Sequence, residues 1–245
     1  MKYNIDAVDK HLETLLAKER SSVQESLNYS ILEGSNIIEL IHDSIVHCKT
    51  QISKIRIQLE KQQDEVICKR LRRQLQCFEN NLMIWNLCGH LQNVSVDIKN
   101  IQTRLYADEL PLIRRKSIGE ACKIVYESSK VLIDNTGAEL RHYIQSQNTE
   151  LVNGFLDEFN MHRKKLTTFR ETYSAKLKNV RVGINAHYDN DIIKQLDIIK
   201  NLSWSDTIET LIEYEKIILG FGPLFSRLIQ VGLQDMACVF VPDDI

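Results

Sequence analysis

The stretch from Ser35 to Cys88 contains no glycine and no proline, and its apolar residues recur at alternating steps of four and three. The first such series is Ile41, Ile45, Cys48, Ile52, Ile55 and Leu59. This spacing places apolar side chains along one side of an α-helix, as in the seam of a coiled coil. It excludes a β-strand, in which side chains alternate with a period of two. The sequence therefore predicts long helices in this part of the chain.

The helical pattern changes phase once, and the change predicts a hairpin. Two later series follow, Leu71, Leu75, Phe78, Leu82 and Trp85, and then Leu91, Val94, Ile98, Ile101 and Leu105. Continuing the first series into the second would place Lys69 and Arg73 in the core. One straight helix from residue 36 to 106 would be about 105 Å long, whereas a compact chain of this length has a radius of gyration of about 18 Å. We therefore expect the chain to fold back, with its tip at residues 61–65.

Composition supports an all-α protein. The 245 residues include only 9 Gly and 3 Pro, which excludes collagen-like chains and turn-rich β folds. With 43% hydrophobic and 26% charged residues, the chain has enough apolar surface for a packed core and is not expected to be disordered. The N-terminus has no apolar run behind a basic cluster, and no segment has about 18 consecutive apolar residues. We expect a cytoplasmic protein that does not contact a membrane.

The second half of the chain is expected to form a separate helical bundle. The periodic pattern stops around Pro111, and Ser117 to Glu120 has the spacing of a capping box at a helix start. Residues 134–137 are typical of a turn. We predict an N-terminal hairpin over residues 1–108, resembling a coiled coil, and a C-terminal bundle over residues 109–245.

The longest apolar stripe of the chain lies in this second half. Its members are Leu151, Phe155, Phe159, His162, Leu166, Phe169, Tyr173, Leu177, Val180, Ile184 and His187. Every step is three or four residues, which predicts a helix with one buried face and a core or interface position for His162. A short helix over residues 192–199 and a last long helix beginning at residues 205–206 should follow, with a kink at residues 222–223 and an extended tail over residues 237–242.

The six cysteines favour neither disulfides nor a metal site. They are Cys48, Cys68, Cys77, Cys88, Cys122 and Cys238, at long and irregular spacings without a C-x-x-C pair. His47 and Cys48, or Cys88 and His90, are neighbours, but neither pair has the spacing of a tetrahedral zinc site. We expect reduced thiols, mostly in helix cores, and a protein that uses no metal and no cofactor.

One segment carries recognisable chemistry, and it lies at the end of the long stripe. In this segment Arg181 is followed, six residues later, by His187, and then by Tyr188. This resembles the R-x(4–6)-H signature of the HEPN superfamily, all-helical domains found in ribonuclease toxins, abortive-infection proteins and CRISPR-associated nucleases. The run Ala-His-Tyr-Asp is especially similar to the abortive-infection branch. The resemblance covers about residues 110–235 and implies a HEPN-like bundle.

The residues of the motif suit metal-independent cleavage of RNA. Such cleavage requires acid–base catalysis at the 2′-hydroxyl and the leaving 5′-oxygen, and an imidazole titrating near pH 6.5 suits this role. A guanidinium presents donors that match phosphate oxygens. We therefore assign His187 as the acid/base group and Arg181 as the phosphate clamp, with Asn185 as a polar assistant. The expected RNA-binding residues are Lys178, Lys176, Tyr188 and Arg170.

Helix geometry and charge add two expectations. Six residues turn a helix through about 600°, so Arg181 and His187 lie about 120° apart. Either His187 lies beyond the last turn, or the site is assembled across a homodimer, since the resemblance implies paired motifs in a dimer cleft. Residues 161–181 carry seven basic residues and one acidic residue, a net +6 in a chain of net charge -2. This basic helix is expected to attract RNA.

The sequence leaves two further functions open. The protein could be a catalytically silent HEPN-like adaptor, because Val182 follows Arg181 where the family usually has a polar residue, and a fold alone does not carry an activity. It could also be a coiled-coil interaction protein. For the nuclease, a toxin of a prokaryotic defence or stress system, an antitoxin or regulatory protein is a further expected partner. A second basic cluster, residues 69–73, is expected to be a solvated face of the hairpin or to touch RNA.

Overall fold

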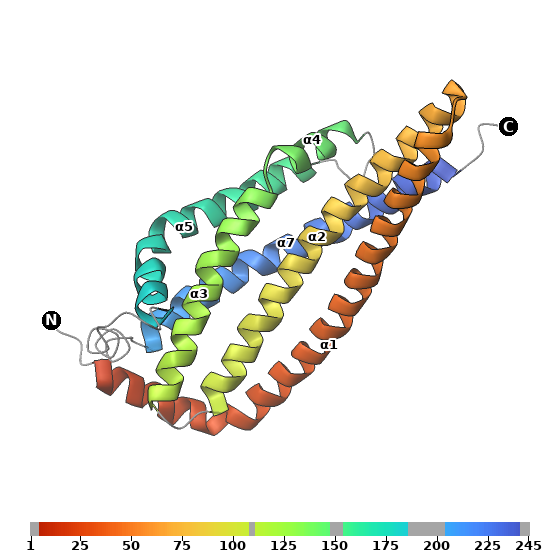
Figure 1. Ribbon diagram of the computed structural model, residues 1–245. Coiled ribbons are helices and arrows are strands. Elements are labelled where there is room, and N and C mark those ends of the chain that lie inside the picture. The colour runs from red at the N-terminus through yellow and green to blue at the C-terminus, as the bar shows by residue number, and fades with distance from the viewer. Residues whose placement is uncertain (1–4, 108–110, 148–153, 186–203, 241–245) are drawn as a thin grey trace.

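The computed structural model describes residues 5–107, 111–147, 154–185 and 204–240, and all its regular elements are helices. In chain order they are α1 (Ile5–Lys61), α2 (Glu65–Ala107), α3 (Pro111–Asn135), α4 (Ala138–Ser146), α5 (Phe155–Asn185) and α7 (Trp204–Phe240). The predicted all-α class is confirmed. The molecule is elongated, and the α1–α2 turn lies at one end of it (Figure 1).

α1 and α2 form the predicted hairpin, with its tip where the phase of the apolar pattern changes. α1 ends at Lys61, and Asp64 caps α2, because its carboxylate accepts bonds from the backbone N–H groups of Val66 at 2.8 Å and Ile67 at 3.2 Å. The two seams meet in a small cluster of buried residues, Cys48, Ile52, Ile55 and Phe78, flanked by Leu59, Leu71, Leu75, Leu82 and Trp85. The out-of-phase seams thus face one another because the chain reverses between them.

Glycines at the two ends of the glycine-free stretch allow α1 and α2 to approach closely. A Cβ atom at Gly34 would lie 2.5 Å from Cγ2 of Val96, and one at Gly89 would lie 3.2 Å from Cγ2 of Ile41. A side chain at Gly34 would therefore force the helices apart. The residues between these two glycines include neither glycine nor proline and are better helix formers.

α7 is the central helix of the bundle. It packs against α2, α5 and α3, with a smaller contact to α1, and Figure 1 shows it passing behind α2 and α3. Its buried residues include Leu211, Tyr214, Ile218, Phe221, Leu224, Phe225, Leu228 and Val231. Its segment from Glu209 to Met236 is long and apolar enough to cross a bilayer, a property that core helices of soluble proteins share. Packing against its neighbours accounts for the buried apolar residues of α7, whereas Ile212, Leu219 and Leu233 of the same helix are exposed.

One hydrophobic core extends across the boundary predicted at residues 108 and 109. Ile98, Ile101 and Leu105 of α2 belong to the same cluster of buried residues as Ile118 of α3 and Phe221 of α7. The division into two domains stays a prediction, and the buried side chains of the two parts pack together.

Two local predictions are revised by the structure, and one is confirmed. The kink at residues 222–223 stays a prediction, and the short helix over residues 192–199 lies outside the described residues. α3 begins at Pro111, so Ser117 and Glu120 lie inside a helix and form no capping box at its start. Proline suits this first position because it has no N–H to leave unpaired. α7 continues through Pro223 and reaches Phe240, so residues 237–240 are helical and not extended. The predicted turn is present, since α3 ends at Asn135 and α4 begins at Ala138.

The cysteines behave as predicted where the structure describes them. Cys48, Cys77, Cys88 and Cys122 are buried thiols, and Cys68 is half-buried. Burial in the core raises the pKa of Cys88 and of Cys122 to about 12, which keeps both thiols protonated and unreactive at neutral pH.

A buried asparagine joins the hairpin to the central helix. The Asn81 side chain is 1% exposed, and its Nδ2 donates to the carbonyl of Cys77 at 3.0 Å and to that of Gly232 at 3.1 Å. A Cβ atom at Gly232 would lie 2.4 Å from Oδ1 of Asn81. The crossing of α2 and α7 therefore needs glycine on one helix and a short amide on the other.

Replacing this glycine tests the crossing. We expect Gly232→Ala to lower the free energy of unfolding by about 1–3 kcal/mol, because the added methyl group displaces Asn81. The exposed neighbour Gln230→Ala is the control and should change it by less than about 0.5 kcal/mol. Urea unfolding followed by circular dichroism measures both. In the double variant Asn81→Ala/Gly232→Ala the cost should be smaller than the sum of the single costs, and strict additivity would contradict the proposed contact.

Candidate nucleic-acid interface on α5

α5 presents one face to the core and the other to solvent. Phe155, Phe159, Leu166, Phe169, Leu177 and Val180 are all buried, as the apolar stripe predicts. The face packs against α3 and α7, and the Phe169 ring lies 5.2 Å from that of Tyr214. Polar links add to this packing, since Tyr173 donates to Glu213 at 2.7 Å and Arg227 pairs with Glu158. α5 is therefore held against its neighbours from Phe155 to Val180.

The basic residues of α5 from Arg163 to Lys178 lie outside this buried face. Lys164, Lys165, Lys176 and Lys178 are exposed, whereas Arg163 and Arg170 are half-buried. Arg170 places its guanidinium carbon 6.0 Å from the centre of the Tyr126 ring on α3, close enough for a cation–π contact. The predicted RNA-binding residues Lys176 and Lys178 are thus at the surface, and Arg170 is partly engaged with the protein.

Arg181 and Asn185 lie in the last two turns of α5. The structure therefore confirms that the motif begins at the end of a long helix. The side chains of these two residues, and His187 and Tyr188 entirely, lie outside the described part of the chain. The convergence of Arg181 and His187 on one phosphate group stays a prediction.

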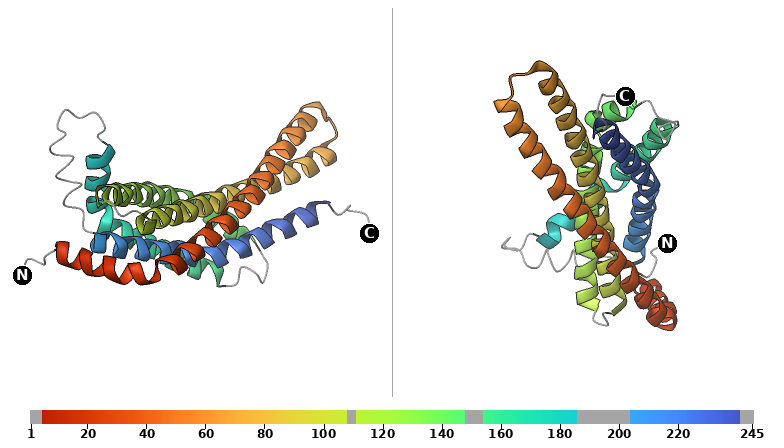
Figure 2. Two further views of the ribbon diagram at one scale, coloured as in Figure 1. Left: turned by 90° about the horizontal axis from the view of Figure 1, so that it is seen from below. Right: turned by 90° about the vertical axis from the view of Figure 1, so that its right-hand side faces the viewer.

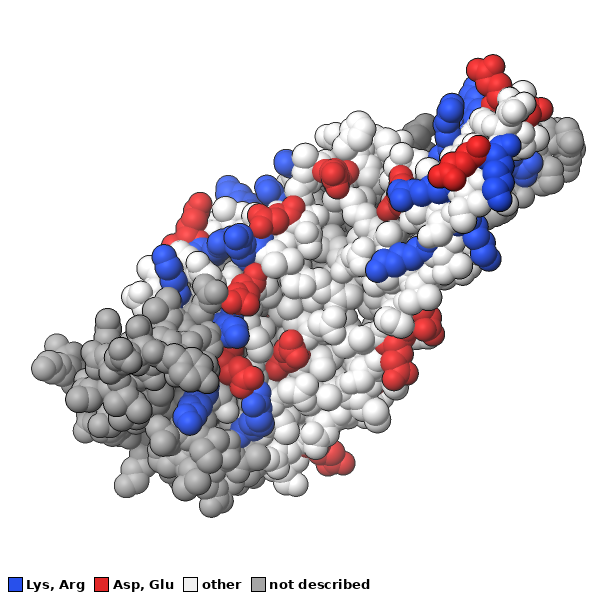
Figure 3. Space-filling view, in the orientation of Figure 1, with Lys and Arg blue, Asp and Glu red and all other residues white. Residues whose placement is uncertain are grey.

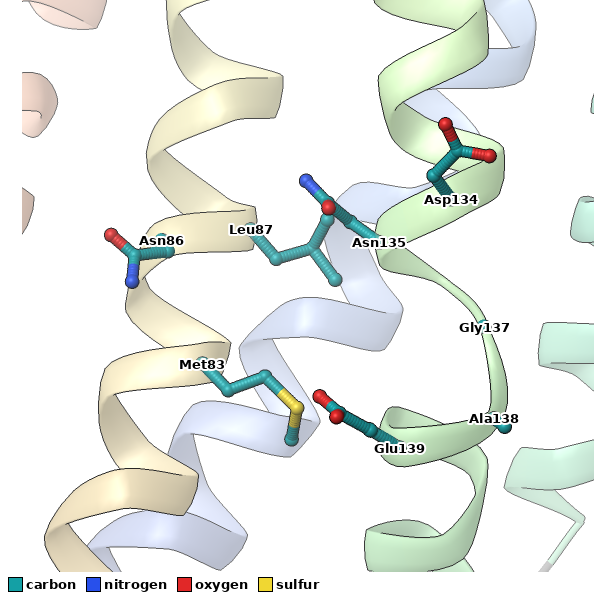
Figure 4. A pocket seen from close by; sticks show the side chains of 8 residues that line it. All are labelled: Met83, Asn86, Leu87, Asp134, Asn135, Gly137, Ala138 and Glu139. Atoms are coloured by element: carbon teal, nitrogen blue, oxygen red, sulfur yellow. The ribbon is translucent and has the colours of Figure 1, made fainter.

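Two neighbouring hollows between α2 and α4 form a second candidate site, which the sequence analysis did not find. The first, of about 320 Å³, lies between α2 and the α3–α4 turn, where Glu139 and Met83 point toward one another (Figure 4). The second, of about 530 Å³, shares Met83 and Glu139 and extends along α2 to Gln76. The sequence predicts the turn but not the space beside it, which depends on how far α4 stands from α2.

These hollows have the wrong charge for a phosphate ligand. Their lining includes the carboxylates of Glu79, Asp134 and Glu139, and it includes no lysine or arginine. An RNA backbone would be repelled here, because like charges at close range are unfavourable. Nor do the described residues bring together three or more His, Cys, Asp or Glu side chains that could hold a metal ion. The hollows therefore do not compete with α5 as an RNA interface.

Buried polar groups between α2, α3 and α7 serve packing. Tyr214 is fully buried, and its hydroxyl lies 2.6 Å from that of Ser128. Burial is the main reason why the pKa of Tyr214 is raised well above its ordinary value, so the phenol stays neutral. Burial also lowers the pKa of His90, an effect that a hydrogen bond to the Ser128 backbone partly offsets. Tyr214 and Ser128 are shielded from solvent and His90 is half-buried, and we assign all three a structural role.

His162 occupies the interface of α5 and α7, as the apolar stripe predicts. Its ring lies 5.6 Å from that of Phe221, and a Cβ atom at Gly220 would be 2.4 Å from its Cε1 atom. Its Nδ1 atom is buried without a hydrogen-bond partner. Desolvation lowers the pKa of His162, with a further decrease from Lys165 and an opposing increase from Glu158. The interface therefore favours the neutral imidazole.

Comparison with known proteins gave no match to a protein-family model, to a curated protein or to a solved structure.

The pH dependence of stability tests the state of His162. Its pKa is lower in the folded than in the unfolded chain, so the unfolded chain binds the proton more readily. The free energy of unfolding should therefore decrease as pH falls through the ordinary value of 6.5 toward the lowered pKa. Urea unfolding at several pH values between about 8 and 5 measures this slope.

The variant His162→Gln should reduce the slope, because glutamine binds no proton in this range. His42→Gln is the matched control, since the His42 side chain is 72% exposed. An unchanged slope in His162→Gln would show that the folded interface tolerates the charged imidazole.

Proposed function

We propose that this protein is a metal-independent endoribonuclease that binds RNA along the exposed side of α5 and cleaves it at Arg181 and His187. The observation that carries the proposal is the course of α5. Its apolar face is fixed in the core, its lysines are exposed, and its last turns contain Arg181. A phosphate chain attracted by the lysines would be led to the motif.

The proposed reaction uses the two ends of the motif in different roles. A base removes the proton of a ribose 2′-hydroxyl, and the 2′-oxygen attacks the adjacent phosphorus. The bond to the 5′-oxygen breaks, and an acid donates a proton to that oxygen, which leaves a 2′,3′-cyclic phosphate and a 5′-hydroxyl. His187 supplies one of the two proton transfers, and Arg181 stabilises the negative charge on the phosphorane. Pairing of two motifs across a homodimer would supply the second transfer.

A cleavage assay tests this proposal. Labelled RNA incubated with the protein and EDTA should give fragments that end in 2′,3′-cyclic phosphate. Arg181→Ala and His187→Ala should each lower the rate by a factor of about 10² to 10⁴, which is the range for loss of an acid/base group or a charge-stabilising donor. His42→Ala and Arg104→Ala are controls, because the His42 side chain is exposed and Arg104 forms an exposed ion pair with Glu120.

The outcomes separate the nuclease from its main alternative. Cleavage that persists in both motif variants would remove Arg181 and His187 from the site. No cleavage by the wild-type protein would favour a catalytically silent helical adaptor. That alternative is supported by exposed apolar side chains on α1, where Tyr29, Leu32 and Leu40 are 62%, 62% and 68% exposed.

A further inference from the structure

The distal part of the α1–α2 hairpin, residues 49–76, is strongly basic. It contains eight lysines and arginines and three acidic residues, a net charge of +5. The basic residues are Lys49, Lys54, Arg56, Lys61, Lys69, Arg70, Arg72 and Arg73, and all eight are exposed. The preceding part of α1, residues 21–48, is different, with four acidic residues and no lysine or arginine. Charge is thus separated along the same helix.

Few of these charges are neutralised within the protein. Arg56 pairs with Glu79 at 2.8 Å, and the carboxylate of Asp64 is engaged in capping α2. Within the described residues, no ion pair involves Lys69, Arg70 or Arg73. Figure 3 shows lysine and arginine side chains over the end of the hairpin, among fewer acidic ones, beyond a largely uncharged area. The end of the hairpin therefore carries a concentrated positive field.

The shape of the hairpin end limits what it can bind. The seam between α1 and α2 at this end consists of Leu59, Leu71 and Leu75. These side chains are half-buried in the contact between the two helices. Successive residues of a helix point about 100° apart. On α2, Lys69 and Arg73 therefore lie on the side opposite the seam, and Arg70 and Arg72 lie to either side of that pair. The positive charge therefore surrounds a narrow arm and does not form a flat patch.

We infer that the basic end of the hairpin, residues 49–76, is a second binding site for the phosphate backbone of RNA. No aromatic residue occurs in this segment, so it lacks both the anchors that dominate protein interfaces and the platforms on which bases stack. Lysine and arginine without such groups bind phosphates independently of sequence. The site rests on the proposed function for the choice of RNA, but RNA binding here requires no cleavage.

An anionic membrane fits the same segment less well. Membrane-surface helices need one apolar face bordered by basic residues. The exposed apolar residues of the hairpin end are Ile57, Val66 and Ile67, and the adjacent Val66 and Ile67 project about 100° apart. They form no continuous face that could enter a bilayer.

The position of the site predicts a dependence on RNA length. The hairpin end and the C-terminal end of α5 lie near opposite ends of the molecule (Figures 1 and 2). α2 begins at the hairpin end, and its 43 residues span about 65 Å. At roughly 3.4 Å per nucleotide of a stacked strand, about 20 nucleotides span the length of α2, so a short RNA cannot reach both sites. Longer RNA should bind more tightly, because its second contact is intramolecular.

Binding to RNA of 10 and 40 nucleotides tests this inference. The background variant is His187→Ala, which keeps the RNA intact under the proposed function, and binding is followed by fluorescence anisotropy at several salt concentrations. The His187→Ala protein with no change in the hairpin should bind the 40-mer at least about tenfold more tightly than the 10-mer. Replacing Lys69, Arg70, Arg72 and Arg73 by glutamine should abolish this preference and reduce the slope of log K against log salt by about 2 to 3.

A second pair of variants controls for net charge and folding. Lys54→Gln/Lys69→Gln changes two exposed lysines of the hairpin end, and Lys130→Gln/Lys216→Gln changes two exposed lysines elsewhere. Only the first pair should weaken binding of the 40-mer. Equal affinities of these two double variants for the 40-mer would overturn the inference. Binding of the hairpin end to phosphatidylserine vesicles but not to RNA would also overturn it.

The two proposals fail in different ways. If wild-type protein does not cleave RNA but its binding depends on the hairpin lysines, the nuclease is wrong and the second site stands. If cleavage depends on Arg181 and His187 but the hairpin variants cleave the 40-mer with unchanged KM, the nuclease stands and the second site is wrong.

Discussion

Burial of the apolar face of α7 holds the other helices in place. This helix contacts α2, α3 and α5, and fully buried Tyr214 and Phe221 lie at these contacts. Complete burial of one such aromatic side chain contributes about 1.5–3 kcal/mol, and α7 buries several. The contact with α2 also requires a close approach, which the pairing of Gly232 and Asn81 permits. The positions of α5 and of the hairpin both follow from this arrangement.

Charge is distributed in a way that the neutral overall composition does not suggest. The exposed side of α5 and the end of the hairpin are basic. Residues 21–48 of α1 and the hollows beside α4 are acidic. The two basic regions lie far apart, so one phosphate group cannot engage both. A long polyanion can engage both, and this connects the proposed nuclease site with the inferred site on the hairpin.

Periodicity predicted the helices well, because each apolar face had to be buried against another helix. The reversal at residues 61–65 was predictable, since a continuous helix would have buried Lys69 and Arg73. Local capping signals were less reliable. Ser117 and Glu120 have the spacing of a capping box, but the helix already begins at Pro111, where its apolar residues reach the core. Residues 237–240 are β-prone by composition, yet they continue a helix that the core has already fixed.

The sequence by itself determined that this protein is all-α, that α1 and α2 reverse at a polar tip, and that α5 has one apolar face and several basic residues outside it. These properties follow from side-chain periodicity along a single helix. Only the tertiary structure decided which helix is central, that Gly34 and Gly232 are needed where helices cross, and that acidic hollows lie between α2 and α4. These depend on distances between helices, which are set by side chains far apart in the chain and leave no local pattern in the sequence.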